Sequence, residues 1–343
     1  MKPARSFMDK LYNVRLLNNS FRPVLDALDA ALFGTDKTTG AAPHMLDHLD
    51  IKRYMSFVII ALLPSAIASV LFFGLRVIAM FAVSYFVGGL IEVSFAIIRK
   101  KEIHEGFMVT GLIFPLVLPP TTPLWVVGVG IGFGVLFGKE VFGGTGRNIF
   151  NPALVGRLFI TIAFPVIMTA AWRVPFTDAI TSATPLTLYR SERIITPYTD
   201  LLFGQCAGSM GEVFRLGIII GGLFLIFSKI SNWRVPVSYL GSVLLFSLIG
   251  NTVLPAKVAP PLFQLLTGGL LFGSMFMATD PVSSPFTRAG KYSFGLLCGI
   301  LTILIRSFSG YVEGVMFSII IMNAFTPLID HVVVTLKYRQ VRT

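Results

Sequence analysis

Residues 54–98 read YMSFVIIALLPSAIASVLFFGLRVIAMFAVSYFVGGLIEVSFAII and carry the clearest structural signal in the chain. Two apolar stretches within them, 54–73 and 77–98, are each long enough to cross a bilayer as an α-helix. Only the three residues Gly74-Leu75-Arg76 separate the two stretches. The run therefore predicts two membrane-spanning helices joined by a tight turn.

The composition extends this interpretation to the whole chain. Of the 343 residues, 54% are apolar and only 13% are charged. A soluble domain could not hide so much apolar surface from water, whereas a bilayer requires it. The 2 Cys and 4 scattered His exclude a disulfide framework and a four-thiolate iron–sulfur or zinc site. We therefore expect a multi-span membrane protein.

Eight further apolar segments follow the first two. The apolar stretch 106–141 is too long for one helix, and prolines, among them Pro119 and Pro120, interrupt it, so we divide it after Pro120. Irregular backbone at membrane depth is tolerated only inside protein or beside a cavity, which makes this break a candidate site. The predicted fold is an all-α polytopic membrane protein with ten transmembrane helices at 54–73, 77–98, 106–120, 125–138, 152–172, 213–227, 235–254, 263–281, 293–308 and 314–334.

The ten segments form two sets of five, each with a third helix broken by proline, near Pro119-Pro120 and near Pro281-Pro285. An odd number of spans in each set requires the second copy to be inverted, an architecture typical of transporters. The predicted organisation is an N-terminal arm at 1–53, a first repeat at 54–172, an extracytoplasmic segment at 173–212, a second repeat at 213–334 and a tail at 335–343.

The distribution of basic residues orients this arrangement. The net charge is +11, and 20 of the 28 Lys and Arg lie in six alternate polar stretches. The positive-inside rule places these stretches, and with them both termini, in the cytoplasm. It places the segment 173–212 outside. The positive charge is therefore an orientation signal, and we expect no nucleic-acid partner. The six stretches are 1–53, 99–105, 139–150, 228–234, 282–292 and 335–343.

Three acidic residues fall within or near the ends of predicted spans: Glu92, Asp280 and Asp330. An acid at mid-membrane costs roughly 2.5 to 3.5 kcal/mol on insertion scales, so each needs a reason to be there. One interpretation is structural, with each carboxylate solvated at a helix end or paired with a loop Lys. The other is a cation or proton path, because a hard ion such as Na⁺ prefers carboxylate, hydroxyl and carbonyl oxygens.

Glycines provide a second set of candidates. The pair Gly88-Gly89 and the glycines from 128 to 138 give small helix faces that admit either a neighbouring helix or a flat ring, and close helix packing is the simpler explanation. The later run 143–147 lacks the GK[ST] ending of a P-loop, so phosphate binding of a nucleotide is not supported.

Several longer motifs, in order along the chain, resemble the B-subunit family of the Na⁺-translocating NADH:quinone reductases. The resemblance covers about residues 50–334. It is specific because several long motifs occur in the same order along the chain. The motifs are His104-Glu105-Gly106-Phe107, Pro119-Pro120-Thr121, Gly138-Lys139-Glu140-Val141-Phe142-Gly143-Gly144-Thr145-Gly146-Arg147-Asn148, Asn151-Pro152-Ala153-Leu154, Met277-Ala278-Thr279-Asp280-Pro281-Val282-Ser283 and Asp330-His331-Val332-Val333-Val334.

The resemblance implies a cofactor site. Members of the family carry FMN bound covalently through its phosphate to a threonine in the motif D-x-x-[ST]-G-A-T, together with a non-covalent riboflavin. This motif falls on Asp178, Thr181, Ala183 and Thr184, which makes Thr184 the attachment residue, and Ser182 replaces the usual Gly. The flavin transferase of the family works outside the cytoplasm. The charge distribution independently places Thr184 on that side.

The resemblance further implies a bacterial inner-membrane subunit that works with five others, A, C, D, E and F, in a redox-driven sodium pump. Electrons from NADH would reach quinone through this complex. We expect quinone beside Gly88 and Gly89, and Na⁺ to pass by way of Glu92, Asp280 and Asp330 as ligands or gates.

Two other interpretations remain open. The tight turn at 74–76 is shorter than the segment that many members of the family have there, and in this it resembles the D-subunit family of the Rnf ferredoxin:NAD⁺ oxidoreductases. The long N-terminal arm and the motif Gly143-Gly144-Thr145-Gly146-Arg147-Asn148 favour the quinone-reductase branch. An inverted repeat with broken third helices would also suit a urea or ammonium channel, which would need no flavin.

Overall fold

A computed structural model describes residues 51–100, 106–177, 182–311 and 313–339. All regular secondary structure in these residues is helical, which confirms the predicted class. Each of the ten predicted segments contains a helix. Five helices are long and apolar enough to cross a membrane, counted over the described residues. They are α4 (Ile51–Phe73), α5 (Arg76–Arg99), α13 (Arg234–Val253), α16 (Arg288–Phe308) and α17 (Val315–Arg339).

Shorter helices occupy the other predicted segments and the region between the two halves. They are α6 (Gly106–Leu116), α7 (Leu124–Val135) with its π-helical extension η1 (Leu136–Glu140), α8 (Pro152–Ala163), α9 (Pro165–Ala170), α10 (Pro185–Glu192), α11 (Tyr198–Phe203), α12 (Arg215–Phe227), α14 (Pro261–Leu266) and α15 (Leu270–Phe272) with the π-helical η2 (Gly273–Met277).

Two predicted spans, 152–172 and 263–281, are interrupted within their length, and the interruption in the second lies well before the break predicted near Pro281-Pro285. The segment 152–172 divides between α8 and α9, because Pro165 has no backbone N–H and begins a new helix after the non-helical Phe164. The segment 263–281 divides between α14 and α15, where Thr267 is extended and Gly268 has a φ of +63°. A positive φ of this size favours glycine.

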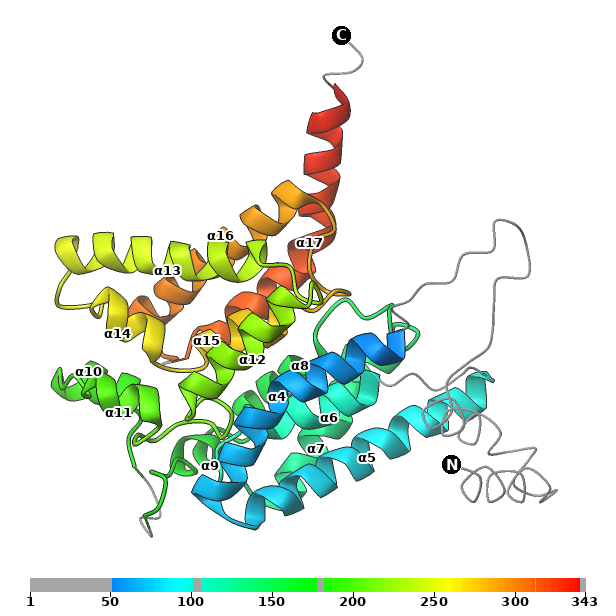
Figure 1. The fold of residues 1–343 in the computed structure, drawn as a ribbon, viewed down its shortest axis with the longest axis horizontal. Coiled ribbons are helices and arrows are strands. Elements are labelled where there is room, and N and C mark those ends of the chain that lie inside the picture. Colours follow the sequence, from blue (N-terminus) through cyan, green and yellow to red (C-terminus); the bar gives the residue numbers. More distant parts are fainter. Residues whose placement is uncertain (1–50, 101–105, 178–181, 312, 340–343) are drawn as a thin grey trace.

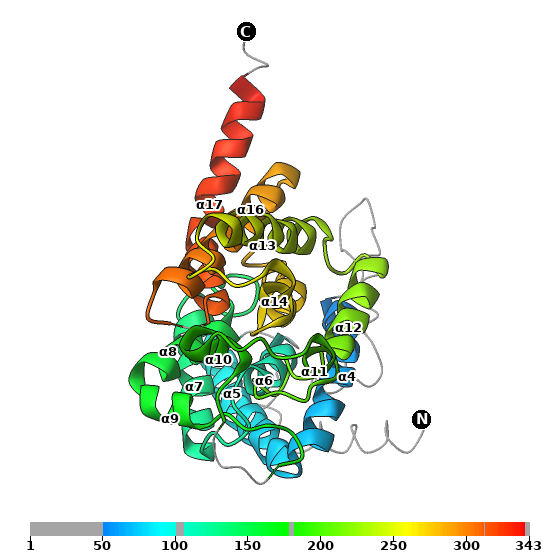
Figure 2. The same ribbon diagram turned by 90° about the vertical axis from the view of Figure 1, so that its left-hand side faces the viewer.

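The packing order of the first half recurs in the second. Helix α5 packs against α6 and α7, and α7 packs against α8. In the same order, α13 packs against α14 and α16, and α16 packs against α17. The halves meet where the corresponding helices α4 and α12 lie side by side, and α8 also contacts α17 (Figures 1 and 2). This recurrence supports the predicted two repeats of five elements.

Three of the glycines from 128 to 138 serve close helix packing, as expected. A Cβ added at Gly130 would lie 2.7 Å from the Ile160 side chain on α8, and one added at Gly138 would lie 2.9 Å from Cα of Pro152. Gly134, between them on the same face, meets the backbone of α8 directly. Helix α7 can approach α8 so closely only because this face carries no side chains.

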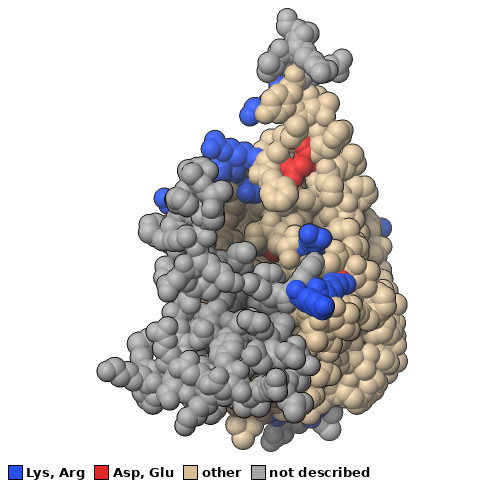
Figure 3. Space-filling model, turned by 90° about the vertical axis from the view of Figure 1, so that its right-hand side faces the viewer, with Lys and Arg blue, Asp and Glu red and all other residues tan. Residues whose placement is uncertain are grey.

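The loops that connect the helices lie at two opposite ends of the molecule. At one end, Arg76 donates hydrogen bonds from Nη2 to the carbonyl oxygens of Thr121 and Thr122, both at 3.2 Å, and Thr121 Oγ1 donates to the Ala171 carbonyl at 2.8 Å. The blue start of α4 and the cyan end of α5 lie at the opposite end, at the right of Figure 1. Figure 3 looks onto that face, where Lys and Arg side chains stand out among few acids. The predicted orientation, with both termini in the cytoplasm, stays a prediction.

Candidate functional site

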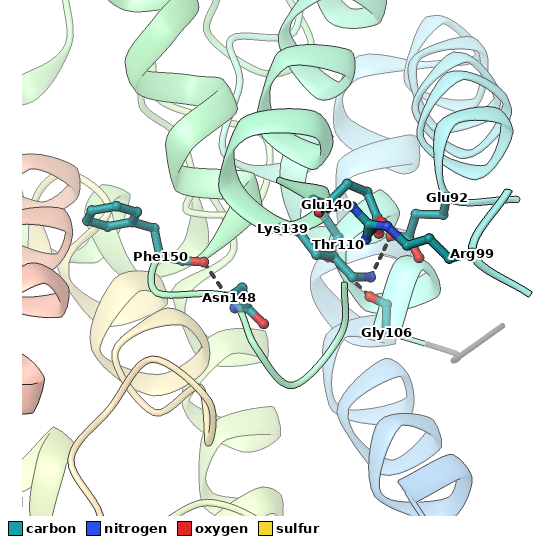
Figure 4. A network of polar contacts seen from close by, with 8 residues as sticks. All are labelled: Glu92, Arg99, Gly106, Thr110, Lys139, Glu140, Asn148 and Phe150. Atoms are coloured by element: carbon teal, nitrogen blue, oxygen red, sulfur yellow. Dashed lines mark hydrogen bonds and ion pairs between the residues drawn. The ribbon is translucent and has the colours of Figure 1, made fainter. Parts of the chain in front are cut away.

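A buried ion pair lies where α5, α6 and η1 meet. Lys139 Nζ donates to Glu92 Oε1 at 2.6 Å, and the Glu92 side chain is only 6% exposed (Figure 4). Glu92 therefore has the Lys partner that one of the two predicted interpretations gave it. The pair also brings together two positions far apart in the sequence, one in a transmembrane helix and one in a motif.

A second ion pair closes this cluster toward the face shown in Figure 3. Arg99, at the end of α5, donates from Nη1 to Glu140 Oε2 at 3.1 Å and from Nη2 to the Glu140 backbone carbonyl at 2.7 Å. Lys139 and Glu140 are consecutive residues of η1, so this π-helical turn presents a cation inward and an anion outward. Isolated π-helical turns occur frequently at functional sites.

The loop after η1 returns the chain to α8. Gly143, Gly144 and Gly146 all have positive φ, at +117°, +94° and +85°, which explains the glycines of this motif. Asn151 then caps α8 by accepting from the Ala153 backbone N–H at 3.0 Å. The motif therefore folds back tightly and brings its polar residues next to Lys139.

These elements line a cavity of about 80 Å³ at the same end of the molecule. Asp280 lies in its wall, and this carboxylate accepts from the Val282 N–H at 3.2 Å and from Ser283 Oγ at 2.9 Å. Lys139 lies in the same wall, so it is shared between Glu92 and the cavity that holds Asp280. Polar residues from four separate parts of the chain line this cavity: Tyr54, Thr110, Lys139, Asn148, Asn151 and Asp280.

Asp330 is held elsewhere by hydrogen bonds to the start of α16. Its carboxylate accepts from the backbone N–H of Phe286 at 2.8 Å and of Thr287 at 3.1 Å, and from Thr287 Oγ1 at 2.6 Å. Asp330 is not among the residues that line the cavity with Asp280. The carboxylate ties α17 to the segment that enters α16, which gives it a structural reason to be in the helix.

Gly88 and Gly89 lie on α5 near the glutamate. A Cβ added at Gly88 would lie 3.2 Å from the Ile131 side chain, so this glycine permits close packing of α5 on α7. Gly89 faces Phe107 with ordinary van der Waals spacing of 3.8 Å. The quinone site at these glycines stays a prediction.

Thr184 lies near the other end of the molecule, at the start of α10. Its Oγ1 accepts from the Thr187 backbone N–H at 3.3 Å and lies 2.9 Å from Thr187 Oγ1, which makes it the N-cap of the helix. The Ser182 N–H donates to the Trp172 carbonyl at 3.0 Å and fixes the chain just before it. Ala183 is exposed, and Asp178 and Thr181 lie outside the described residues.

Thr184 borders a cavity of about 180 Å³. Trp172 and Tyr311 supply aromatic surfaces in its lining. Arg157, a buried residue of α8, also lines it and forms an ion pair with Glu313 of the same lining, across a separation of 156 residues, so this positive charge is already paired. The cavity can therefore receive a planar ring beside the Thr184 hydroxyl.

The partners of the buried basic residues could not be predicted from the sequence. Lys139 stands out there only as part of a motif, and Arg157 only as one of the eight basic residues outside the six cytoplasmic stretches. Each is buried, and a basic residue inside an apolar segment is itself a signal that an acidic partner lies in contact with it. The identity of that partner depends on helix packing, which a single sequence does not reveal.

Comparisons with known proteins place these features in a family. A family model described as "NQR2, RnfD, RnfE family" matches residues 38–339. The chain is similar to proteins named as the B subunit of Na(+)-translocating NADH-quinone reductase. It is 46% identical over 268 residues to that of Ectopseudomonas mendocina (strain ymp), covering 74% of this chain and 66% of the relative, and 44% identical over 280 residues to that of Yersinia pestis, covering 77% and 68%.

A third relative extends the similarity to nearly the whole chain. The B subunit from Azotobacter vinelandii (strain DJ / ATCC BAA-1303) is 36% identical over 388 aligned positions, covering 96% of each protein. The alignment is longer than the 343 residues of this chain, so the relative contains segments that this chain lacks. The matches to the Ectopseudomonas and Yersinia proteins span about two thirds of those relatives, just under that fraction for the first.

Proposed function

Because the chain belongs to the NQR2, RnfD, RnfE family, we propose that it is the membrane electron-transfer subunit of a redox-driven sodium pump, on the path from NADH to quinone. The names of the three relatives, all B subunits of Na(+)-translocating NADH-quinone reductases, support this branch over the ferredoxin:NAD⁺ oxidoreductases. The partners would be the other subunits of that complex, A, C, D, E and F. The proposed location is the bacterial inner membrane, with both termini in the cytoplasm.

The environment of Thr184 carries the cofactor part of the proposal. Residues around it fit FMN held through its phosphate. A phosphate on this hydroxyl would lie at the N-terminus of the eight-residue α10, where backbone N–H groups and the helix dipole favour negative charge. Trp172 and Tyr311 would contact the flavin ring, and Arg157, which is paired with Glu313, lies in the same lining. When bound, a flavin supplies one- and two-electron redox chemistry.

The protein's own residues would control the ion path. The cavity that Lys139 and Asp280 line offers carboxylate, hydroxyl and amide oxygens, the ligands that Na⁺ prefers. Glu92 lies behind Lys139, and Asp330 ties α17 to α16 and would act as a gate between helices. The proposal also includes a quinone site beside Gly88 and Gly89 and a non-covalent riboflavin bound in the subunit.

In-gel fluorescence tests the cofactor assignment. The chain is produced together with a flavin transferase of the family, separated on a denaturing gel and viewed under ultraviolet light. We expect a fluorescent band for the wild type and for Thr187→Val, and none for Thr184→Val. The Thr187 variant is a matched control, because it removes a hydroxyl 2.9 Å away and from the same helix start.

The outcomes separate the redox function from a plain solute channel. A band that persists in Thr184→Val would move the attachment to another residue. Absence of fluorescence from the wild type, despite an active transferase, would contradict the redox proposal and favour the channel.

A further inference from the structure

The face that includes α10 and α14, seen in Figure 2, contains a basic cavity that the proposed function does not use. Its volume is about 230 Å³. Four of the described residues that line it are cations and none is an acid. The four are Arg190, Arg193, Lys257 and Arg306. The cavity shares no lining residue with the one beside Thr184.

This clustering is unexpected from the charge distribution. Only eight of the 28 basic residues lie outside the six stretches assigned to the cytoplasm, and four of these eight meet here. The positive-inside rule leaves the outer loops of a membrane protein poor in Lys and Arg. Their convergence on one cavity therefore requires a reason other than orientation.

Arg306 forms the fixed inner wall of the cavity. It is buried, and its Nη1 donates to the Gln264 backbone carbonyl at 2.9 Å and to Gln264 Oε1 at 3.0 Å, while its Nη2 donates to the Thr267 carbonyl at 2.9 Å. A Cβ at Gly268 would lie 2.7 Å from Nη2, so the glycine preserves the space for this guanidinium. Every one of these acceptors is neutral, and the two acids that act on this guanidinium from nearby, Glu212 and Glu313, form no ion pair with it.

Two buried donors at this wall have no hydrogen-bond partner in the described structure: Nε of Arg306 and the hydroxyl of Ser307. A buried donor without a partner destabilises the fold, because it has lost its hydrogen bonds to water. Native proteins keep few such groups, and those that persist often mark a place where a ligand or ion completes the hydrogen bonding.

The three outer cations are exposed and held only loosely. The guanidinium of Arg193 lies 5.1 Å from the centre of the Tyr189 ring, and Nζ of Lys257 lies 5.4 Å from the centre of the Phe308 ring. Arg190 donates to the Ser309 carbonyl at 2.6 Å. No described acid forms an ion pair with any of these three or with Arg306.

We propose that this cavity is a binding site for a phosphate-bearing anion. Arg and Lys together provide planar and point-like cationic donors, which suit the oxygens of a phosphate group. Its lining includes Lys257, four residues after the end of α13, and Ser307, in the last turn of α16. Because both helices are long and apolar enough to cross a membrane, we expect the cavity near the level of the phospholipid headgroups. The phosphate belongs either to an anionic lipid or to a soluble compound. The site does not depend on the flavin assignment.

The test uses the full-length chain in detergent, stripped of co-purified lipid, and follows its thermal unfolding midpoint. Three probes are titrated: dioctanoyl phosphatidylglycerol, dioctanoyl phosphatidylcholine and inorganic pyrophosphate. The double variant Arg193→Gln/Lys257→Gln removes two cations that hold no backbone hydrogen bond. The control Arg288→Gln/Lys337→Gln removes the same charge from exposed positions at the other end of the chain's helices.

We expect a saturable rise of the midpoint with phosphatidylglycerol or with pyrophosphate, and little with the zwitterionic lipid. The concentration for half of the effect should increase roughly tenfold to thirtyfold in the cavity variant, at about 1 kcal/mol for each basic residue near an anionic lipid, and stay unchanged in the control. A response to the lipid alone identifies a headgroup, and a response to pyrophosphate identifies a soluble phosphate.

Equal responses of the wild type and the cavity variant to every probe would overturn the proposal. So would the absence of any saturable response of the wild type to phosphatidylglycerol and to pyrophosphate. In the absence of any probe, both variants should unfold at the same midpoint as the wild type, which verifies that neither has lost its fold.

Discussion

Glu92 and Lys139, 47 residues apart in the sequence, form an ion pair of 2.6 Å between two buried side chains. The pair joins the last third of the membrane-spanning helix α5 to the π-helical turn η1 that follows α7. Removing two charges from water is expensive, and a buried pair repays this only when its geometry is good. The lysine also lies in the wall of the cavity that holds Asp280, so the pair connects two of the three acids expected on an ion path.

The first prediction concerns the energy of this pair. Glu92→Gln or Lys139→Met alone leaves one buried charge without its partner and should lower the free energy of unfolding by about 3 to 5 kcal/mol. The double variant removes both charges and should recover most of that loss. Denaturation of the purified chain, followed by fluorescence, measures both. Additive losses in the double variant would show that the two side chains do not act as a pair.

The second prediction concerns sodium. If Lys139 occupies a place that Na⁺ takes during transport, Lys139→Met should alter the Na⁺ concentration that half-activates quinone reduction by the assembled complex. Glu92→Gln should also alter it, while both variants keep covalent FMN on the gel. An exposed substitution, Lys337→Gln, serves as the control. Identical Na⁺ activation in all three variants and the wild type would assign the pair to structure alone.

The third prediction concerns the contact between α7 and α8. In Gly134→Ala the new Cβ would overlap the Pro152 carbonyl and lie 2.9 Å from the Gly156 backbone N. Backbone atoms cannot move aside as a side chain can, so we expect a loss of at least about 1 to 3 kcal/mol. Gly128→Ala is the matched control on the same helix, since its Cβ would lie 3.6 Å from Val83. A thermal midpoint that falls equally in both would contradict the packing role.

Much of this fold could be predicted because hydropathy and proline are local signals. The spans that begin near Tyr54 and Val77 follow directly from their apolar lengths, and the break at Pro119-Pro120 follows from proline chemistry. The divisions at Pro165 and Thr267 were missed, because an apolar stretch of the right length hides a short interruption. A proline at the first position of a second helix looks the same as a tolerated kink.

The candidate sites could likewise be predicted only where the signal lies within one short segment of the sequence. The position of Thr184 at a helix start and beside an aromatic cavity agrees with a motif that lies within one short segment. The partners of Glu92 and Arg157 are 47 and 156 residues away, and only the packed structure identifies them. The convergence of four cations, Arg190, Arg193, Lys257 and Arg306, on one cavity also depends on the packing of α10, α14 and α16, although the sequence already predicted that they lie on the less basic side.

The fourth prediction concerns Asp330. Asp330→Ala removes three hydrogen bonds to Phe286 and Thr287, and bonds to a charged acceptor contribute about 1.5 to 3 kcal/mol each, so the unfolding free energy should fall by roughly that amount or more. Thr287→Ala tests the same contact from the other side. The losses should be less than additive in the double variant. A gating role predicts in addition a changed Na⁺ activation, which a purely structural contact would leave unchanged.

The fifth prediction concerns pH. Glu212 lies in the segment between the two repeats, and burial raises the pKa of its carboxyl, with nearby Glu313 adding to the effect against the opposing charges of Arg215 and Arg157. Because this pKa is higher in the folded protein than in the unfolded chain, protonation of Glu212 stabilises the fold. This contribution to the free energy of unfolding is complete below the pKa of the unfolded chain and is lost as the pH rises through the pKa of the folded protein. Glu212→Gln stays neutral at every pH. Its thermal midpoint should therefore match the wild type near pH 4 and exceed it near pH 8. As a control, the thermal midpoint of the exposed Glu192→Gln should match that of the wild type at every pH. If the midpoint of Glu212→Gln falls together with that of the wild type as the pH rises, another group is responsible for the titration.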